Sequence, residues 1–587
     1  MCPIGRISWW CDMSKTVPVI TGSWRLYLVL TVLLLGVIAL VWKVLSLNVV
    51  ERDFLQGQGD ARTLRTEPIM AHRGMITDRN GEPLAISSPV KSIWLNPREI
   101  IGNPAHIEQL AAALDLNVAS LSENIVDNAG REFMYVRRRM PPPEADRVLA
   151  LGLDGVYARQ EYQRYYPQGE ITAQLIGFSN IDDAGQEGLE LAYDDWLRGV
   201  PGRQQVMKDR RGRIIRELNT LEQAQPGRAL ELSIDFRIQN LAYRELKAEF
   251  VQRQARAASA VVLDVETGEV LAMVNQPSFN PHNRQTLGDF GSLRNRAVTD
   301  LFEPGSTIKP FTAVAALETG QFHRHSMLDT SPGRIRVGRD SVNDRGNDYG
   351  EISLEQVIVK SSNVGTALTA LEIGHEPLRD VLQRVGFGEG IATGFPGEQT
   401  GMLPSHRVWH DIETATLSFG YGLSTTTLQL AQAYAVLASG GIFRPVSLLK
   451  GGGGGLPGGQ SERRVLDEAI TREVQAMLEA VVDVERGGFD GASVPFYRVA
   501  GKTGTARVVG ARGYEANLTN SMFAGYAPAD DPRIVVVVII NEPQGTQRYG
   551  SQVAAPIFSR IAAGAMRLLE VPPQNDDSLN QLRLTAR

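Results

Sequence analysis

Cysteine is nearly absent from this chain of 587 residues, and its two cysteines both lie close to the N-terminus. Cys2 and Cys11 precede a long apolar run, so the chain after that run contains no thiol. A stretch without thiols excludes disulfides, thiolate zinc sites and cysteine nucleophiles. Met13 is an alternative start, and a chain that began there would contain no cysteine.

An excess of positive charge is lacking as well. The formal net charge is −6 and the isoelectric point is about 5.9, so charge gives no reason to expect nucleic acid as a partner. The mean hydropathy of −0.15 excludes a protein with many membrane spans. With 43% hydrophobic and 21% charged residues, the composition is that of a globular protein, and the length predicts several domains.

One apolar run is long enough to cross a membrane. Residues 26–42 carry no charge, and apolar residues continue after Lys43 as far as Leu47, so the run reaches the roughly 20 residues that a span requires. The run has no polar face, unlike a core helix, and no small-x-small cleavage site follows it, unlike a signal peptide. The sequence therefore predicts an uncleaved transmembrane helix over residues 26–47.

Flanking charges predict how this helix is oriented. Three basic residues and one acidic residue precede the run, whereas two acidic residues and one basic residue follow it in residues 51–53. By the positive-inside rule, residues 1–25 form a cytoplasmic tail and about 540 residues lie on the other side of the membrane.

Patterns of hydrophobic residues divide the rest of the chain. A polar, glycine-punctuated stretch over 48–65 predicts a stalk, and residues 66–225 mix short strand and helix patterns, with a hairpin turn at Asp78–Gly81 but no catalytic cluster. In residues 226–570 we expect a helix over 235–255, a hairpin over 260–274, strands over 497–509, 521–526 and 533–541, and a helix over 553–569. The run Ile534–Ile540 is apolar on both faces and predicts a buried central strand. Because strands from both ends enclose a mostly helical insert, this region is expected to be an α/β or α+β domain, followed by a polar tail over 571–587.

Ser306 and Lys309 are the first candidate catalytic pair. Residues three apart share a face of a helix, so the hydroxyl and the amine can meet at the start of the apolar helix that follows Pro304 and Gly305. There, free backbone amides favour a developing oxyanion, and burial lowers the pKa of a lysine so that the neutral amine can accept the serine proton. The spacing alone is weak, because three of the nine lysines follow a serine in this way.

Two further motifs strengthen the first. Ser361-Ser362-Asn363 follows 55 positions after Ser306, and Lys502-Thr503-Gly504-Thr505 lies within a strand pattern, where Gly504 allows a substrate backbone to approach closely. The S-x-N pattern is common, but Lys-Thr-Gly occurs once in the chain. In this order the three motifs are the signature of penicillin-binding proteins and serine β-lactamases.

Metal chemistry is not expected. His406 and His410 have the spacing of a zinc-binding helix, but the glutamate of that motif and a third evident ligand are absent. We therefore predict neither a metal nor another cofactor.

The chain resembles the class B high-molecular-weight penicillin-binding proteins, and among them the division-specific septal transpeptidases. The resemblance covers nearly the whole chain beyond the tail and includes these segments: His72–Gly81, Tyr166–Glu170, Gly188–Glu190, Lys208–Arg210, Arg294–Arg296, Phe302–Ser306, Lys360–Gly365, Ser418–Gly422 and Gly501–Ala506. It implies a non-catalytic pedestal (dimerisation) domain over 66–225 and a transpeptidase domain over 226–570, with a central antiparallel sheet between helices. It also implies a single-pass protein of the bacterial inner membrane with a periplasmic catalytic domain.

The resemblance further implies a D,D-transpeptidase that cross-links peptidoglycan stem peptides and is acylated by β-lactams. Ser306 would attack the D-Ala–D-Ala carbonyl and Lys309 would be the base, while Ser361 and Lys502 pass the proton to the leaving amine. Asn363 would hold the substrate's side amide, and the Lys502-Thr503-Gly504-Thr505 strand would bind the terminal carboxylate through its threonines. The amides of Ser306 and Thr505 would form the oxyanion hole.

Several alternatives remain open at this point. A class A β-lactamase needs a deacylating glutamate in an E-x-x-L-N context, which the Glu398 segment does not match, and the glutamate-rich glycosyltransferase motif of bifunctional relatives is absent before Ser306. Glycan polymerisation is therefore expected from a membrane-embedded partner, alongside other division proteins. A D,D-carboxypeptidase and a penicillin-acylated, non-catalytic scaffold of the division machinery are the other hypotheses.

Overall fold

The computed structural model describes residues 23–52, 64–208, 214–283, 290–452, 461–510 and 513–574. Its contacts divide the chain into two units, one of residues 1–69 and 202–223 and the other of residues 70–201 and 224–587. Most of the predicted cytoplasmic tail, stalk and C-terminal tail lie outside the described residues.

The first unit contains the apolar helix and a small sheet. Helix α1 (Ser23–Leu45) continues into a π-helical turn, η1 (Ser46–Val50). The span Trp24–Val49 has a mean hydropathy of 2.7 and no buried part, so the predicted helix is present and is long and apolar enough to cross a membrane. The strands β1 (Leu64–Ile69), β8 (Gly202–Lys208) and β9 (Ile214–Glu222) form an antiparallel sheet in the order β1-β8-β9.

The second unit begins with a five-stranded sheet. Its path is β10-β2-β3-β4, and β5 pairs with β3. The strands are β2 (Ile76–Thr77), β3 (Pro83–Leu95), β4 (Met134–Met140), β5 (Val156–Tyr165) and β10 (Leu230–Glu231). The predicted turn joins β2 to β3: the Asp78 N–H donates to the Glu82 carbonyl at 2.9 Å, and Gly81 has a φ of +86°. Glycine adopts that left-handed conformation without strain.

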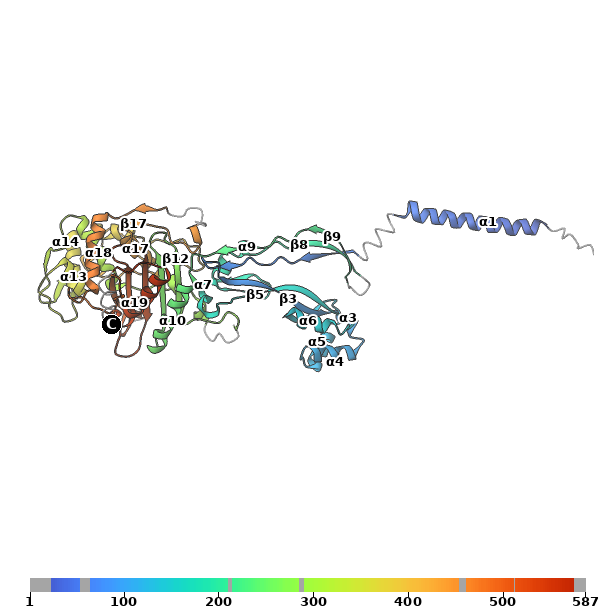
Figure 1. The fold of residues 1–587 in the computed structure, drawn as a ribbon, viewed down its shortest axis with the longest axis horizontal. Coiled ribbons are helices and arrows are strands. Elements are labelled where there is room, and N and C mark those ends of the chain that lie inside the picture. Colours follow the sequence, from blue (N-terminus) through green and yellow to red (C-terminus); the bar gives the residue numbers. More distant parts are fainter. Residues whose placement is uncertain are drawn as a thin grey trace, which may run out of the picture. The chain divides into compact units, whose positions relative to one another are not determined.

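Short helices pack against the ends of these strands around a small core of their own (Figure 1). They are α3 (Pro97–Ile100), α4 (Pro104–Ala113), α5 (Val118–Asp127) and α6 (Pro142–Leu149). Further along lie η2 (Gly169–Ile171), α7 (Ala173–Ile176), β6 (Phe178–Ser179), β7 (Gly185–Glu187), α8 (Gly188–Ala192) and α9 (Asp194–Leu197).

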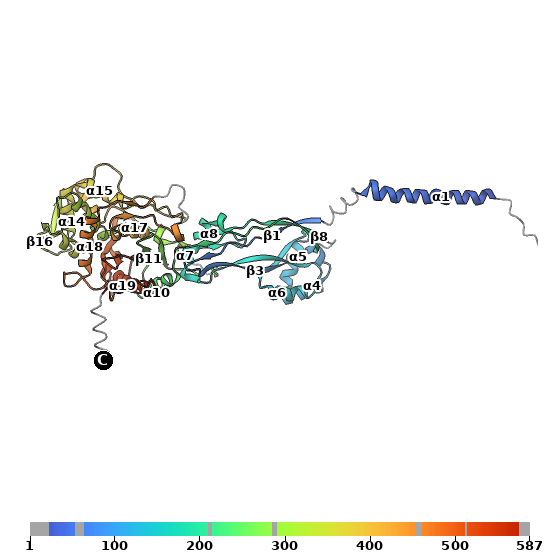
Figure 2. The ribbon, with the colours of Figure 1, turned by 45° about the horizontal axis from the view of Figure 1, so that its top comes forward.

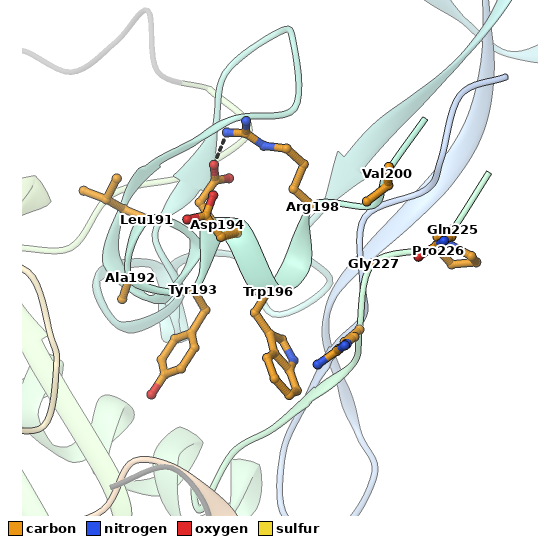
Figure 3. Close-up of a pocket in the computed structure, with 12 residues that line it drawn as sticks. Leu191, Ala192, Tyr193, Asp194, Trp196, Arg198, Val200, Gln225, Pro226 and Gly227 are labelled. Atoms are coloured by element: carbon orange, nitrogen blue, oxygen red, sulfur yellow. Dashed lines mark hydrogen bonds and ion pairs between the residues drawn. The ribbon is translucent and has the colours of Figure 1, made fainter. Parts of the chain in front are cut away.

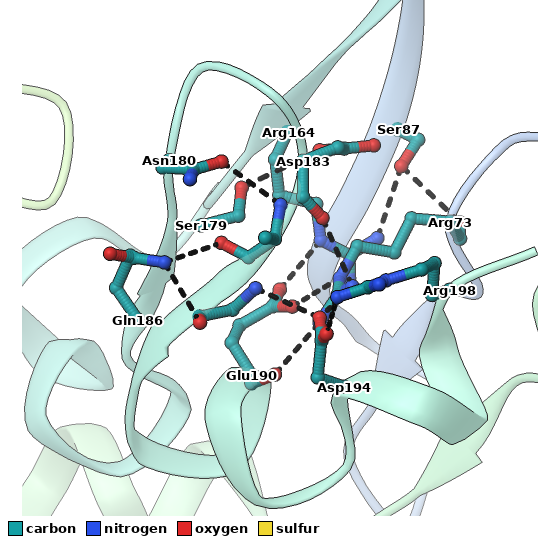
Figure 4. A network of polar contacts seen from close by, with 12 residues as sticks. Arg73, Ser87, Arg164, Ser179, Asn180, Asp183, Gln186, Glu190, Asp194 and Arg198 are labelled. Atoms are coloured by element: carbon teal, nitrogen blue, oxygen red, sulfur yellow. Dashed lines mark hydrogen bonds and ion pairs between the residues drawn. The ribbon is translucent and has the colours of Figure 1, made fainter.

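A buried ionic network ties these elements together (Figure 4). Glu190 on α8 is wholly buried and accepts from Nε of Arg73 and Nε of Arg164, each at 2.6 Å. Arg73 also donates to Asp194 Oδ1 at 2.6 Å, and Asp194 in turn pairs with Arg198. Charges this deeply buried are tolerated only when they are paired and hydrogen-bonded. The network therefore fixes β5, α8, α9 and the segment before β2 against one another.

The catalytic half contains an antiparallel sheet built from both ends of its sequence, as predicted. The strand order is β12-β11-β21-β20-β19. The strands are β11 (Ala257–Asp264), β12 (Val270–Gln276), β19 (Ala500–Gly510), β20 (Gly513–Ala527) and β21 (Ile534–Asn541). Strand β21 is buried on both faces: Val535, Val537 and Ile539 belong to one core cluster, and the residues between them to the other. The predicted central strand is confirmed.

Helices cover both faces of this sheet. Helices α10 (Phe236–Gln252) and α19 (Gly550–Leu568) lie side by side on one face (Figure 2), and α17 (Thr427–Ala438) packs on the other. Helix α10 begins where the pattern predicts, because the Asp235 side chain accepts from the Arg237 N–H as an N-cap.

The helical insert carries most of the remaining elements. The helices are η4 (Phe290–Leu293), α11 (Arg296–Thr299), η5 (Gly305–Ile308), α12 (Lys309–Glu318), α13 (Leu354–Lys360), α14 (Asn363–Ile373), α15 (His375–Arg384), α16 (Asp411–Ser418), η6 (Lys450–Gly452) and α18 (Glu468–Val482). Short two-stranded pairs join β13 (Met327–Asp329) to β16 (Glu351–Ser353), β14 (Arg334–Val337) to β15 (Asp340–Asn343), and β17 (Ile442–Phe443) to β18 (Arg463–Arg464).

Candidate active site

Ser306 lies on the 3₁₀ turn η5, half-buried, immediately before helix α12. The sequence predicts an α-helix at this point, but the structure has a tighter turn that becomes α-helical only at Lys309. Side chains three apart eclipse one another in a 3₁₀ turn, so Ser306 and Lys309 still face the same way. Gly305 makes the turn possible, because its φ is +53°.

The segment Ser418–Gly422 supports this turn from behind. The Gly305 N–H donates to the Gly420 carbonyl at 3.0 Å, and a Cβ on Gly420 would lie 2.0 Å from the carbonyl oxygen of Gly305. Glu303 adds a second tie, since its Oε1 accepts from the Gly422 N–H and from the Tyr514 hydroxyl, each at 2.9 Å. The close backbone approach explains why glycine is required at position 420.

The Lys309 side chain is fully buried between the second and third motifs. Its Nζ donates to the Ser361 carbonyl at 2.6 Å and to Asn363 Oδ1 at 2.8 Å, and it lies 3.3 Å from Ser361 Oγ. Burial lowers the pKa of Lys309 well below its usual value, and the positive charge of Lys502 lowers it further. A neutral amine at this position can act as a base.

Ser361 lies between the two buried lysines. It ends helix α13 in the left-handed conformation, with a φ of +57°, which is uncommon for a residue other than glycine. Its Oγ accepts from Lys502 Nζ at 3.0 Å. Burial lowers the pKa of Lys502 to about 7, helped by the charge of Arg345. The three side chains form a continuous path for a proton.

Asn363 starts helix α14, and its position is set by a buried carboxylate. Asp344 Oδ1 accepts from the backbone N–H groups of Asn363 at 2.5 Å and Val364 at 3.0 Å, while Oδ2 accepts from Ser362 Oγ at 2.6 Å. A carboxylate at a helix N-terminus is favoured by the free amides and the helix dipole. The Asn363 amide also donates to the Asn343 carbonyl at 3.2 Å.

Thr503, Gly504 and Thr505 lie on β19, the edge strand of the sheet. The Thr505 carbonyl accepts from Arg345 Nη2 at 3.4 Å, so it points away from β20. The N–H and carbonyl of one residue point to the same side in an antiparallel strand, and the Thr505 N–H therefore also faces outward. A Cβ on Gly504 would lie 2.4 Å from Cγ of Met522 and 2.9 Å from Cγ2 of Thr307, which explains the glycine between the two threonines.

The predicted residues converge on one cleft of about 220 Å³. Ser306, Ser361, Asn363, Thr503 and Thr505 line it, while Lys309 and Lys502 are buried and reach Ser361. The cleft is also lined by residues that the sequence does not single out: Asp344, Arg345, Asn347, Tyr349, Lys360, Tyr549, Gly550 and Ser551. No local motif marks Asp344 or Arg345, because packing of the loop after β15 against α14 brings them to the site.

A larger hollow, of about 740 Å³, contains none of the predicted catalytic residues (Figure 3). Tyr193 and Trp196 project from its wall, and Trp196 is 45% exposed and lies under the Arg228 guanidinium. The carboxylate of Asp194 is occupied by Arg73 and Arg198. The lining also includes the exposed Asp195 but none of the residues of the three motifs, so we assign no catalytic role to this hollow.

The paired histidines of the sequence have local partners. His406 Nε2 lies 2.9 Å from Glu413 Oε2, and His410 is the N-cap residue of α16. Within the described ranges, no group of three or more His, Cys, Asp or Glu side chains is arranged to hold a metal ion.

This geometry fits an active-serine site for acyl transfer, in which a buried lysine can act as the base and an edge strand can pair with an extended substrate. Comparison with known families agrees: residues 258–563 match the penicillin binding protein transpeptidase domain, and residues 68–232 match the penicillin-binding protein dimerisation domain.

Individual relatives match over almost the whole chain. The probable peptidoglycan D,D-transpeptidase PbpC of Pseudomonas aeruginosa is 42% identical over 94% of this chain and 96% of its own length. The peptidoglycan D,D-transpeptidase FtsI of Escherichia coli K12 is 43% identical over 94% of this chain and 93% of its own. The crystal structure of penicillin-binding protein 3 of Mycobacterium tuberculosis with aztreonam has 28% identity and a TM-score of 0.66, and the match covers 87% of this chain and 98% of that one. The chain belongs to the class B penicillin-binding proteins, which confirms the resemblance and the fold predicted from the sequence.

Proposed function

We propose that this chain, a serine-type D,D-transpeptidase by family, cross-links peptidoglycan stem peptides at the division septum. The observation that carries the proposal is the hydrogen-bonded series Lys309–Ser361–Lys502 beside Ser306. It supplies a neutral base next to the nucleophile and an acid with a pKa of about 7 next to the leaving group.

The first half of the reaction forms an ester. Ser306 Oγ attacks the carbonyl carbon of the penultimate D-alanine, and Lys309 Nζ takes the hydroxyl proton. The C–N bond then breaks, and Ser361, supplied by Lys502, gives a proton to the departing nitrogen. Free D-alanine leaves, and the rest of the stem peptide remains as an ester on Ser306.

The second half transfers the acyl group. The amine of a neighbouring stem peptide attacks the ester carbonyl, loses its proton to the same chain of side chains, and forms the cross-linking amide as Ser306 Oγ regains its proton. In both halves we assign the oxyanion to the backbone N–H groups of Ser306 and Thr505. The outward direction of the Thr505 N–H supports that assignment.

We assign substrate binding to the edge strand and to Asn363. An extended peptide can pair with β19 as an additional strand. Asn363 would hold the amide of the acyl chain, whereas Thr503 and Thr505 would bind the terminal carboxylate, with Gly504 leaving room for the peptide backbone.

The position of Glu398, the glutamate considered as a deacylating base, disfavours hydrolysis of an acyl-enzyme. Glu398 accepts from the backbone N–H groups of Ala392 at 2.8 Å and Thr393 at 3.0 Å, so its carboxylate is committed to its own loop. It is not among the residues that line the cleft. A penicilloyl ester on Ser306 should therefore persist, as β-lactam inhibition of this family requires.

Membrane anchoring and partners complete the proposal. The protein is membrane-anchored, and we place residues 1–25 in the cytoplasm and the catalytic domain in the periplasm on the basis of the flanking charges. We also propose that glycans come from a membrane-embedded polymerase and that other division proteins bind this chain. The absence of a glycosyltransferase motif before Ser306 supports the need for such a partner.

Acylation of the full-length protein in detergent by a fluorescent penicillin tests the site. We expect a label that is stable for hours on the wild type and on Ser88→Ala, the serine of another S-x-x-K sequence, and no label on Ser306→Ala. Rapid loss of label would instead indicate a β-lactamase.

A second assay separates the remaining alternatives. The protein is incubated with a glycan polymerase, and the peptidoglycan formed is digested: cross-linked dimers support transpeptidation, whereas trimmed monomers alone indicate a carboxypeptidase. In cells, depletion should produce filaments, and rounded cells would contradict a septal role.

A further inference from the structure

Arg345 is a cation at the mouth of the cleft to which the reaction described above gives no role. It follows β15 directly, lines the cleft with Ser306 and Thr505, and donates from Nη2 to the Thr505 carbonyl at 3.4 Å. Its guanidinium group therefore reaches across the cleft from the loop after β15 to the edge strand.

The backbone of Arg345 is held firmly although its side chain is exposed. Its φ of +55° lies in the left-handed region, which is uncommon for arginine, and its N–H donates to Asn343 Oδ1 at 3.1 Å. The preceding residue, Asp344, is locked by three hydrogen bonds to the start of α14. A strained backbone that is held in this way is characteristic of functional sites.

The charge of Arg345 is not neutralised by the protein. Among the described residues, Arg345 forms no ion pair: no carboxylate oxygen lies within 4.0 Å of its guanidinium nitrogens. The adjacent Asp344 has both oxygens engaged by hydrogen-bond donors from residues 362–364. Lys360, which also lines the cleft, adds a second exposed positive charge. The mouth of the cleft is thus electropositive beyond what the buried lysines contribute.

The neighbours of Arg345 indicate which part of a substrate it meets. Asn363, assigned to the amide of the acyl chain, donates to the Asn343 carbonyl two residues before Arg345. The Thr505 carbonyl, which Arg345 occupies, is an acceptor on the edge strand for an incoming peptide N–H. The assignment of Asn363 places Arg345 on the acyl side of the scissile bond, whereas the hydroxyl of Thr505, and not its carbonyl, is assigned to the carboxylate of the departing D-alanine.

We propose that Arg345 is a specificity-determining residue that binds a carboxylate on the acyl side chain of the donor. The inference rests on the proposed roles of Ser306, Asn363 and Thr505. A peptide N–H takes over the Thr505 carbonyl as the substrate enters, and the freed guanidinium turns to the carboxylate. A planar guanidinium matches a carboxylate with two parallel hydrogen bonds, and stem peptides carry free carboxylates upstream of their terminal D-alanines.

Two penicillins that differ by a single carboxylate test this proposal. Benzylpenicillin has an uncharged side chain, and carbenicillin has the same side chain with one carboxylate added. The second-order acylation rate of each is measured on the full-length protein in detergent. We expect Arg345→Gln to lower the carbenicillin rate about five- to tenfold more than the benzylpenicillin rate. Loss of the Arg345 charge also changes the pKa values of Lys309 and Lys502. That change alters both acylation rates alike and cancels in their ratio.

Arg339→Gln is the matched control, because it removes the same charge from the exposed turn between β14 and β15, outside the cleft lining. It should leave the ratio unchanged. In the wild type, raising the salt concentration should lower the carbenicillin rate relative to that of benzylpenicillin, a result that does not depend on a variant folding.

A ratio that is the same in Arg345→Gln and the wild type would overturn the proposal, and so would a ratio insensitive to salt. Failure of benzylpenicillin to acylate the wild-type protein at all would instead overturn the proposed active site. The two failures are therefore distinguishable.

Discussion

The pH dependence of acylation follows from the two buried lysines and can be worked out in advance. If protonated Lys502 is required, its pKa of about 7 makes the rate fall with rising pH. The protonated fraction drops from about one half at pH 7 to about 1% at pH 9, so the rate should fall about 50-fold over that interval. A lysine with its usual pKa of 10.5 would remain about 97% protonated at pH 9 and give a flat profile.

The opposite limb belongs mainly to Lys309. Its pKa is lowered well below the usual value by burial and by Lys502, so the neutral base should be lost as the pH falls through that lowered pKa. The two limbs together give a bell-shaped profile, whose apparent pKa values are properties of the coupled pair.

The assay is the second-order rate of labelling by a fluorescent penicillin between pH 5 and 10, on full-length protein at constant ionic strength. Lys502→Arg keeps its charge throughout this range, so the basic limb should disappear even though the rate is lower overall. Lys360→Arg, which is exposed at the same cleft, should retain both limbs. A wild-type rate that stays level or rises from pH 7 to pH 9 would refute the role given to protonated Lys502.

Two further predictions concern residues outside the proton path. Glu190→Ala should lower the free energy of unfolding by about 3–5 kcal/mol, because it leaves the buried Arg164 guanidinium without a carboxylate and leaves Arg73 with Asp194 alone. Asp182→Asn, at an exposed ion pair, should cost less than about 1 kcal/mol; urea titration followed by tryptophan fluorescence measures both, and similar costs would contradict the network's importance. Gly420→Ala should slow acylation at least about tenfold, because the new Cβ would displace the turn that carries Ser306. Gly81→Ala is the control: its φ is similar, but no atom lies within 4 Å of the new Cβ, so this variant should acylate normally. An unchanged labelling rate in Gly420→Ala would show that the turn tolerates displacement.

Much of the catalytic half could be predicted from its sequence because the information is local. Burial on both faces was expected along Ile534–Ile540, and that run is the central strand between two core clusters. Asp235 has the side chain of an N-cap, and α10 begins directly after it. The three motifs specified chemistry by residue type and order, and all of them line or reach one cleft.

What could not be predicted depends on contacts between residues far apart. Arg73 and Glu190 are separated by 117 positions, and no residue close to either one in the sequence indicates a buried ion pair. Arg345 reaches Thr505 across 160 positions. The 3₁₀ turn at Ser306 also depends on a tertiary contact, because Gly420, from a different segment, packs closely against Gly305 and accepts a hydrogen bond from its N–H.

The topology of the catalytic sheet imposes an order of events on the newly made chain. Strand β11 is buried along its whole length and pairs on one side with β12, but its other partner, β21, is synthesised about 270 residues later. Until then the hairpin of β11 and β12 presents an open apolar edge, which is prone to pairing with other chains. A product truncated anywhere before residue 534 would contain up to three motifs but would lack β21, the strand that joins the β11–β12 hairpin to β20 and β19.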